Sequence, residues 1–302
     1  MNVEIRNAHI IANPVAGGGK GKAKALALEA ALILRGVETT LFCTSKAGDG
    51  RVEAGQTTAD VVVVVGGDGT LNEVLNGLPE RFTCALAILP VGTANVVARE
   101  MGMRSKVATV ADAIVAGNYI DMDVGLHGEQ RFLLGAGAGL DAAVAHAVHS
   151  GRGRKSNLMK WVGPSLRVVF GYDYPHIRVT VDGAVVAEDG EYVIVGNCRY
   201  SAGVFPATPQ SVINDHQLDV CIMRKLSWGR LLWLVFRVWN PNFVDASWIT
   251  YCQGQTVLLE PADSDKPVLM QIDGDPAGQL PGTFTLLDWP VRMIRPKGCG
   301  IV

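Results

Sequence analysis

Residues 61–73 of this chain, which read VVVVVGGDGTLNE, decide its fold. Five consecutive valines are typical of a strand that is buried on both faces of a sheet, and we expect a helix over 71–78. The glycines between them let backbone amides approach phosphate oxygens beside a helix N-terminus. Asp68 adds a carboxylate that could hold Mg²⁺ through water or accept a hydroxyl proton. A simpler interpretation stays open, in which Asp68 and Thr70 only cap the helix.

The same alternation of strand and helix surrounds this stretch over the first 125 residues. Expected strands lie at 8–12, 37–43, 61–65 and 86–91, and expected helices at 20–34, 71–78 and 95–101. This rhythm predicts a parallel sheet that is covered by helices.

Two further glycine-bearing turns each follow an expected strand. Residues 13–20 read NPVAGGGK and residues 90–95 read PVGTAN. The first turn is not a P-loop, because Ala16 and Ala23 stand where that motif needs glycine and a hydroxyl residue. A flexible hinge and a helix cap are the simpler interpretations of the two turns. Since parallel strands end at a common sheet edge, three such turns together predict a ligand site there.

The pattern changes after about residue 125. A hairpin is expected around the Asp182-Gly183 turn. Further expected strands lie at 191–197, 218–223, 256–260, 268–273 and 283–287. The sequence therefore predicts an antiparallel β domain over 126–287, after a nucleotide-binding α/β domain over 1–125.

The composition of the chain argues against nucleic-acid binding, secretion and a membrane-spanning segment. The 302 residues carry a net charge of −2 with a pI of about 6.3, so a nucleic-acid partner is not expected. Six scattered cysteines without CxxC spacing favour reduced thiols in a cytoplasmic protein. The first ten residues do not resemble a signal peptide, and no apolar run reaches the roughly 18 residues of a membrane span.

The three turns together resemble those of the diacylglycerol kinase catalytic family, which includes bacterial lipid kinases and the sphingosine and ceramide kinases. The double-glycine turn is also found in NAD kinases and phosphofructokinases. Further resemblances lie at 123–125, 139–142, 197–200, 214–220 and 273–275. The family fold implies an NAD kinase-like or phosphofructokinase-like α/β domain joined to a β-sandwich-like domain, with the tail 288–302 returning to the first.

The resemblance also implies roles for individual residues. Asp275 matches the catalytic acid that takes the proton from the lipid hydroxyl, and Asp68 is its rival or a ligand of the catalytic Mg²⁺. We expect these two carboxylates to face one another across a cleft. The residues expected to contact ATP are Asn13, Thr44, Gly66, Gly67, Asp68, Gly69, Thr70, Asn72 and Thr93.

Further residues are implied for the lipid and for a second metal. Asp123 and Asp141 match positions that orient the lipid head group. A structural Mg²⁺ would be bound by the Asp215 carboxylate and by the carbonyls of Val212 and Gln217.

This sequence departs from the family pattern at three positions. Asp275 stands where the family has glutamate, His216 replaces the glycine after Asp215, and Val96 replaces a frequent aspartate. Residues 273–275 are also open to interpretation as a plain hairpin turn.

The most aromatic stretch, 226–239, holds three tryptophans and two arginines and suits a water–lipid interface, although a core helix has the same pattern. A short basic segment at 152–160 could contact anionic lipid or be a solvated loop. We therefore expect peripheral membrane association, and a homodimer stays open.

These features predict an ATP-dependent kinase that phosphorylates a hydroxyl of a membrane lipid. Diacylglycerol is the first expectation, and a sphingoid base or ceramide fits the same motifs. Two alternatives stay open: a soluble-substrate kinase of the NAD kinase type, and a nucleotide- and lipid-binding protein without turnover.

Overall fold

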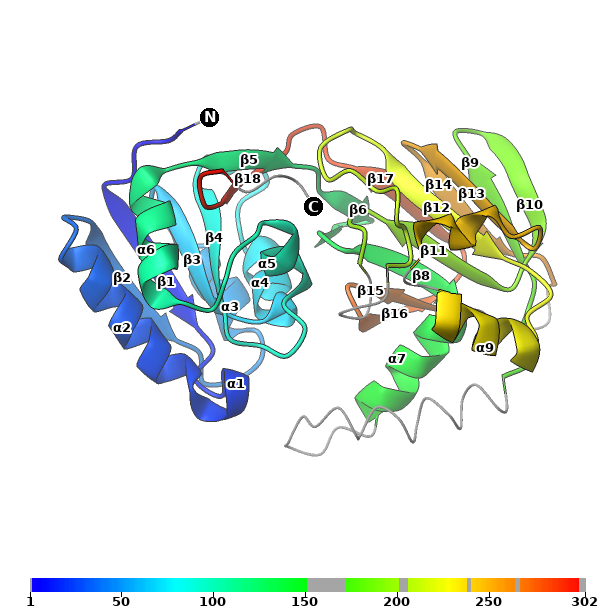
Figure 1. The fold of residues 1–302 in the computed structure, drawn as a ribbon, viewed down its shortest axis with the longest axis horizontal. Coiled ribbons are helices and arrows are strands. Elements are labelled where there is room, and N and C mark those ends of the chain that lie inside the picture. The colour runs from blue at the N-terminus through cyan, green and yellow to red at the C-terminus, as the bar shows by residue number, and fades with distance from the viewer. Residues whose placement is uncertain (1, 151–171, 201–205, 238–239, 264–266, 299–302) are drawn as a thin grey trace. The chain divides into compact units, whose positions relative to one another are not determined.

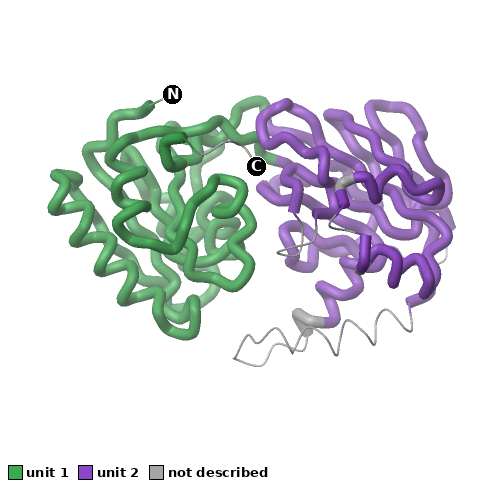
Figure 2. Tube along the Cα trace, in the orientation of Figure 1, with its two compact units in different colours: residues 1–124, 288–302 green, residues 125–287 purple. Residues whose placement is uncertain are grey.

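The chain crosses twice between two compact units, which Figure 2 distinguishes by colour. Unit 1 holds residues 1–124 and 288–302, and unit 2 holds residues 125–287. The computed structural model describes residues 2–150, 172–200, 206–237, 240–263 and 267–298.

A six-stranded sheet in the order β2-β1-β3-β4-β18-β5 forms the centre of unit 1. Its strands are β1 (Asn7–Ala12), β2 (Glu38–Cys43), β3 (Val61–Gly66), β4 (Ala85–Pro90), β5 (Tyr119–Met122) and β18 (Val291–Ile294). Every pair of neighbours is parallel except β18 and β5. All six residues of β3 are buried, as five consecutive valines predict for a strand that is covered on both faces.

Helices cover both faces of this sheet (Figure 1). They are α1 (Ala16–Gly19), α2 (Gly21–Ile33), α3 (Asp49–Ala54), α4 (Asp68–Leu75), α5 (Val96–Glu100) and α6 (Val107–Ala116). Helices α2 and α6 pack together on one face, while α3 and α4 pack together on the other. The predicted parallel α/β fold is confirmed.

The described residues of unit 2 form two antiparallel sheets, each of six strands. One has the order β10-β9-β14-β17-β6-β7 and the other β13-β12-β11-β8-β15-β16. The strands are β6 (Gly125–His127), β7 (Gln130–Phe132), β8 (Gly135–Gly139), β9 (Ile177–Val181), β10 (Ala184–Gly190), β11 (Tyr192–Gly196), β12 (Leu218–Met223), β13 (Ile249–Gly254), β14 (Val257–Pro261), β15 (Leu269–Ile272), β16 (Asp275–Gln279) and β17 (Gly282–Leu286). Both sheets contribute to one hydrophobic core, so the predicted antiparallel sandwich is confirmed.

In the described residues of unit 2 there are also three helical segments: α7 (Leu140–Ser150), α9 (Trp228–Arg237) and the 3₁₀ helix η1 (Pro241–Asp245). Helix α7 packs on β8, β15 and β16. Helix α9 and η1 contribute to a second, smaller core with β11, β12 and β13.

One predicted boundary is wrong in a way that bears on the site. Helix α4 begins at Asp68, three residues before the expected start at Leu71. The Gly67 carbonyl accepts the N–H groups of Thr70 and Leu71, at 3.0 and 3.1 Å, so the glycine-rich segment already forms the first helical turn. Asp68 therefore belongs to the helix N-terminus rather than to a loop.

Candidate functional site

Two of the three glycine turns, the one that follows β3 and the one that follows β4, are in direct contact. The Gly66 carbonyl accepts the N–H groups of Val91 and Gly92, at 2.8 and 3.2 Å. A Cβ added at Gly92 would lie 2.7 Å from the Cα of Gly67, so a side chain there would force the two turns apart. Glycine at these positions therefore allows two strand ends to approach each other closely.

The glycine turn that follows β1, residues 13–20, contacts both of the others. Asn13 donates from Nδ2 to the Thr70 hydroxyl at 3.5 Å, and its Oδ1 accepts the N–H of Val15. Gly17 has a φ of 60°, and a Cβ there would lie 2.6 Å from the Val91 carbonyl oxygen. The three predicted turns thus form one cluster beyond the carboxyl ends of β1, β3 and β4.

The Asp68 carboxylate ties this cluster to a second helix. Its oxygens accept the N–H groups of Val96 and Val97, at 3.0 and 3.1 Å, and so cap the N-terminus of α5. The N-cap residue of α4 itself is Gly67, which makes no side-chain cap hydrogen bond. Burial raises the pKa of Asp68 and the amide donors oppose that rise. These amide donors hold the carboxylate in place at the start of α5.

The other predicted nucleotide contacts differ in exposure. Gly69 and Thr93 are exposed, and a Cβ at Gly69 would meet open space. Thr44 is only 9% exposed, and its N–H donates to the Ala12 carbonyl at 2.9 Å. Asn72 is half-buried within α4. Thr44 thus extends the parallel pairing of β1 and β2 by one residue, and its contact with ATP stays a prediction.

In unit 2, the two-residue hairpin turn Asp273-Gly274 joins β15 to β16, and Asp275 is the first residue after it. Ile272 pairs with Asp275 across the turn, and Asp273 and Gly274 have φ values of 49° and 86°. Positive φ at both central residues defines a type I′ turn, for which Asp-Gly is a favoured sequence. The Asp273 carboxylate accepts the N–H groups of Leu133, Leu134 and Gly135, at 3.1, 2.9 and 3.1 Å. The turn is therefore fixed against the start of β8.

Gln271 is a candidate site residue that sequence reasoning missed. Its Nε2 donates to Asp141 Oδ2 at 2.9 Å, and its Oε1 accepts the N–H of Gly274 at 2.7 Å. The side chain, 7% exposed, links Asp141 to the turn that carries Asp275. A single glutamine within an expected strand has no spacing that a motif search recognises, although its place two residues before the Asp-Gly turn was visible.

Asp141, at the start of α7, lies close to the backbone of β8. A Cβ added at Gly137 would lie 2.3 Å from Asp141 Oδ2, so this glycine makes room for the carboxylate. Burial raises the pKa of Asp141 to about 7, and the hydrogen bond from Gln271 opposes that rise. Asp141 is therefore a carboxyl group that changes charge near neutral pH.

The predicted structural metal position has oxygen donors of the type that Mg²⁺ prefers. Asp215 Oδ1 accepts the N–H of Gln217 at 3.1 Å, while Val212 is half-buried nearby in the chain. His216 has a φ of 57°, a left-handed conformation that explains why glycine suits this position. Within the described residues no group of three or more His, Cys, Asp or Glu side chains gathers at a metal-binding distance. A carboxylate with two carbonyls is compatible with that finding, and the site stays a prediction.

Asp123, the remaining predicted substrate residue, follows β5 and is 3% exposed. Its contact with a lipid head group stays a prediction.

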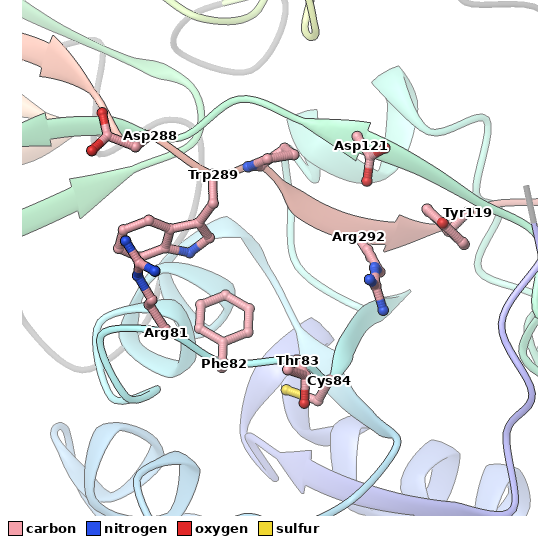
Figure 3. Close-up of a pocket in the computed structure, with 10 residues that line it drawn as sticks. Arg81, Phe82, Thr83, Cys84, Tyr119, Asp121, Asp288, Trp289 and Arg292 are labelled. Atoms are coloured by element: carbon pink, nitrogen blue, oxygen red, sulfur yellow. The ribbon is translucent and has the colours of Figure 1, made fainter.

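A hollow of ≈ 510 Å³ lies at a different place in unit 1 (Figure 3). Arg81 stacks 5.6 Å from the centre of the Trp289 ring, and Arg292 lies 5.6 Å from that of Tyr119. Arg81 and Cys84 line the hollow and precede β4, whereas the glycine turns follow β3 and β4. The hollow therefore lies at the opposite end of β4 from the turns.

The fold has the architecture of NAD kinases. An NAD kinase from Archaeoglobus fulgidus, solved in complex with ATP, matches with a TM-score of 0.57 at 13% identity over 97% of this chain and 94% of that one. This likeness shows the fold alone.

The chain belongs to the diacylglycerol kinase family. Residues 7–127 match the diacylglycerol kinase catalytic domain, and residues 135–296 match the YegS C-terminal NAD kinase beta sandwich-like domain. Diacylglycerol kinases from Staphylococcus carnosus and Bacillus subtilis are each 25% identical to it, over 97% of this chain and 96% and 97% of theirs. A diacylglycerol kinase structure from Bacillus anthracis superimposes with a TM-score of 0.78 at 24% identity, covering 98% of this chain and 99% of that one. Membership of this family implies kinase activity with ATP as the phosphate donor.

Proposed function

We propose that this protein transfers the γ-phosphate of ATP to a hydroxyl of a membrane lipid, with diacylglycerol as the first substrate to test. The observation that carries the proposal is the cluster of three glycine turns, in which Gly69 and Thr93 are exposed and the Asp68 carboxylate is bound to the start of α5. Full-length similarity to bacterial diacylglycerol kinases supports the lipid as acceptor.

The turn cluster provides what a polyphosphate needs. Backbone N–H groups at the N-terminus of α4 favour phosphate oxygens, and glycine lets those oxygens come close. A bound Mg²⁺ would neutralise charge on the β- and γ-phosphates, and Asp68 is the carboxylate that would hold it. Since the amides of Val96 and Val97 fix both Asp68 oxygens, we assign this residue to the metal rather than to proton transfer.

Asp275 is our candidate for the proton acceptor. The lipid hydroxyl oxygen bonds to the γ-phosphorus while the bond from that phosphorus to the β–γ bridging oxygen breaks, so ADP leaves. The hydroxyl proton passes to the Asp275 carboxylate. The rigid turn at Asp273 and Gly274, together with Gln271, supports the position of Asp275. Aspartate is one methylene shorter than the family's glutamate, so we expect proton transfer directly or through one water.

Labelled ATP offered with a panel of acceptors tests the proposal. The panel contains dispersed diacylglycerol, ceramide, a sphingoid base and NAD, and products are separated by thin-layer chromatography. We expect labelled lipid phosphate with at least one lipid and no labelled product with NAD. Label on NAD alone would support the soluble-substrate alternative, and tight ATP binding without labelled product would support a non-catalytic protein.

A further inference from the structure

Helix α9 carries a stripe of exposed apolar side chains, formed by Trp228, Leu232 and Phe236. These residues are spaced by four, so they lie on one face of the helix. Their exposed fractions are 44%, 57% and 81%. Single exposed apolar residues are ordinary on a protein surface, but three in a row on one helix face are characteristic of a binding surface.

The opposite face of α9 is anchored in unit 2. Leu234 is 4% exposed in the core that the helix shares with Phe243, and Leu231 packs against the same core. Trp233 makes an edge contact with Trp248 at 5.5 Å between ring centres. Because this inner face fixes the rotation of the helix, the Trp228–Leu232–Phe236 stripe is held outward.

The surroundings of the stripe are basic. Residues 224–240 contain four Lys or Arg and no Asp or Glu. Arg224 pairs with Asp189 at 2.8 Å. Lys225 is exposed, and Arg230 and Arg237 lie 5.2 and 5.8 Å from the ring centres of Trp248 and Trp233. Arg230 and Arg237 therefore lie on a flank of α9 rather than within the stripe, and with Lys225 they give this end of the unit a positive charge that suits the phosphate head groups of a bilayer.

We propose that the Trp228–Leu232–Phe236 stripe of α9 docks on the surface of an anionic lipid bilayer, an inference that rests on the proposed function. No helix in the part of the chain that the structure describes has the length and apolar character to cross a membrane. An amphipathic helix of ten residues with cations at its flanks instead lies in the plane of the interface. Such docking would bring the enzyme to a substrate that resides in the bilayer. The basic segment 152–160 and Trp239 lie outside the described residues, and the inference does not use them.

Vesicle sedimentation of the full chain tests this docking. The probes are phosphatidylcholine vesicles and phosphatidylcholine vesicles with about a third phosphatidylglycerol. The test variant carries Leu232→Glu and Phe236→Glu. The matched control is Leu34→Glu, because Leu34 is 85% exposed and lies in unit 1. We expect the test variant to bind anionic vesicles at least ~10-fold more weakly than wild type, and the control to bind like wild type.

Activity measurements separate this inference from the function on which it rests. On diacylglycerol in vesicles we expect the test variant to lose activity in proportion to its binding, while activity on a dispersed short-chain diacylglycerol stays unchanged. Vesicle binding that the variant loses, without phosphorylation of any lipid by wild type, would support docking and contradict the proposed function. Unchanged vesicle binding by an active, folded variant would overturn docking alone.

Two other results would also overturn it. If the variant has half the wild-type mass in vesicle-free solution, the stripe is an interface between two copies of the chain. If wild type binds both kinds of vesicle equally, the surface does not recognise anionic lipid.

Discussion

Unit 2 contains two hairpin turns of the same construction and different surroundings. In both, an aspartate and a glycine have positive φ: 47° and 82° at Asp182-Gly183, and 49° and 86° at Asp273-Gly274. In both, the aspartate accepts backbone N–H groups from a neighbouring segment, from Gln255 and Thr256 in one case and from residues 133–135 in the other. Local turn chemistry therefore accounts for the Asp-Gly pair in each hairpin.

The two turns differ in the residue after the Asp-Gly pair and in the side chains that support it. The Asp182 turn continues with the exposed Ala184, whereas the Asp273 turn continues with Asp275. In the Asp273 turn, the N–H of Gly274 donates to the side chain of Gln271, and the same side chain donates to Asp141. A hairpin needs neither an acid after the glycine nor a glutamine linked to a second carboxyl group. We therefore propose a functional role for Asp275, Gln271 and Asp141, and a structural role for the Asp-Gly pairs.

The largest expected effect comes from making the second turn resemble the first. Asp275→Ala converts Asp-Gly-Asp to Asp-Gly-Ala and removes the proton acceptor. We expect transfer of labelled phosphate to lipid to fall by about 10²–10⁴-fold, while the melting temperature stays within a few degrees of wild type. The reverse change in the other turn, Ala184→Asp, is the matched control and should leave activity unchanged. Near-wild-type transfer by Asp275→Ala would remove this residue from the mechanism.

Asp68 in unit 1 tests the same distinction between a functional and a structural carboxylate, because it also accepts backbone N–H groups. Asp68→Asn keeps one accepting oxygen for α5 but loses the charge that would hold Mg²⁺. We expect about 10²-fold lower activity and about 1 kcal/mol lower stability, measured by phosphate transfer and by urea unfolding. Activity that falls only as far as the unfolded fraction rises would make Asp68 a helix cap and nothing more.

Gln271→Leu removes the link between Asp141 and the second turn. We expect kcat to fall about 10-fold with little change in KM for ATP, because the turn remains but the position of Asp275 is less defined. Thr180→Val is the matched control, since Thr180 stands two residues before the other Asp-Gly pair. A loss confined to stability, with kcat unchanged in the folded fraction, would make Gln271 purely structural.

Asp141 makes stability depend on pH. Burial raises its pKa to about 7, above the ordinary aspartate value of 3.8, so the folded state binds more protons than the unfolded state between these values. Stability therefore falls as pH rises from about 4 to about 7 and is level above that. Asp141→Asn removes this dependence. Relative to wild type we expect a gain on the order of 2 kcal/mol at pH 8, allowing for screening by water, and a much smaller gain at pH 5. Equal effects in urea unfolding at both pH values would contradict this protonation behaviour.

The smallest effect is expected at the turn without a functional link. Asp182→Asn should cost about 1 kcal/mol of stability, because one amide-accepting charge is lost at an exposed site. Phosphate transfer by the folded protein should match wild type. A clear loss of activity in this variant would mean that the Asp182 turn also has a functional role, and that the two turns do not differ as we propose.

The sequence predicted the architecture well because its signals are local and strong. A run of valines before a glycine turn admits few alternatives to a buried parallel strand, and the alternation before and after residue 125 separates the two fold types. The start of α4 was predicted three residues too late, because Gly67 and Gly69 are residues typical of a loop. In the structure the Gly67 carbonyl already accepts helical N–H groups.

The site was less accessible to sequence reasoning. The capping of α5 by Asp68 joins positions 28 and 29 residues apart, and the link from Asp141 to Gln271 spans 130. Such contacts depend on tertiary packing, which residue spacing does not encode. Sequence reasoning therefore named the candidate carboxylates, whose roles stay predictions, and missed the amides and the glutamine that contact them.

Our proposal requires that Asp68 and Asp275, which belong to different units, act in one phosphoryl transfer. A double-mutant cycle with Asp68→Asn and Asp275→Asn, measured as initial transfer from labelled ATP to dispersed diacylglycerol, tests this requirement. If both groups act in the same step, the double variant should lose about as much activity as the more damaging single variant. Losses that multiply, with each single variant retaining measurable transfer, would show that the two carboxylates act independently and would contradict the proposal.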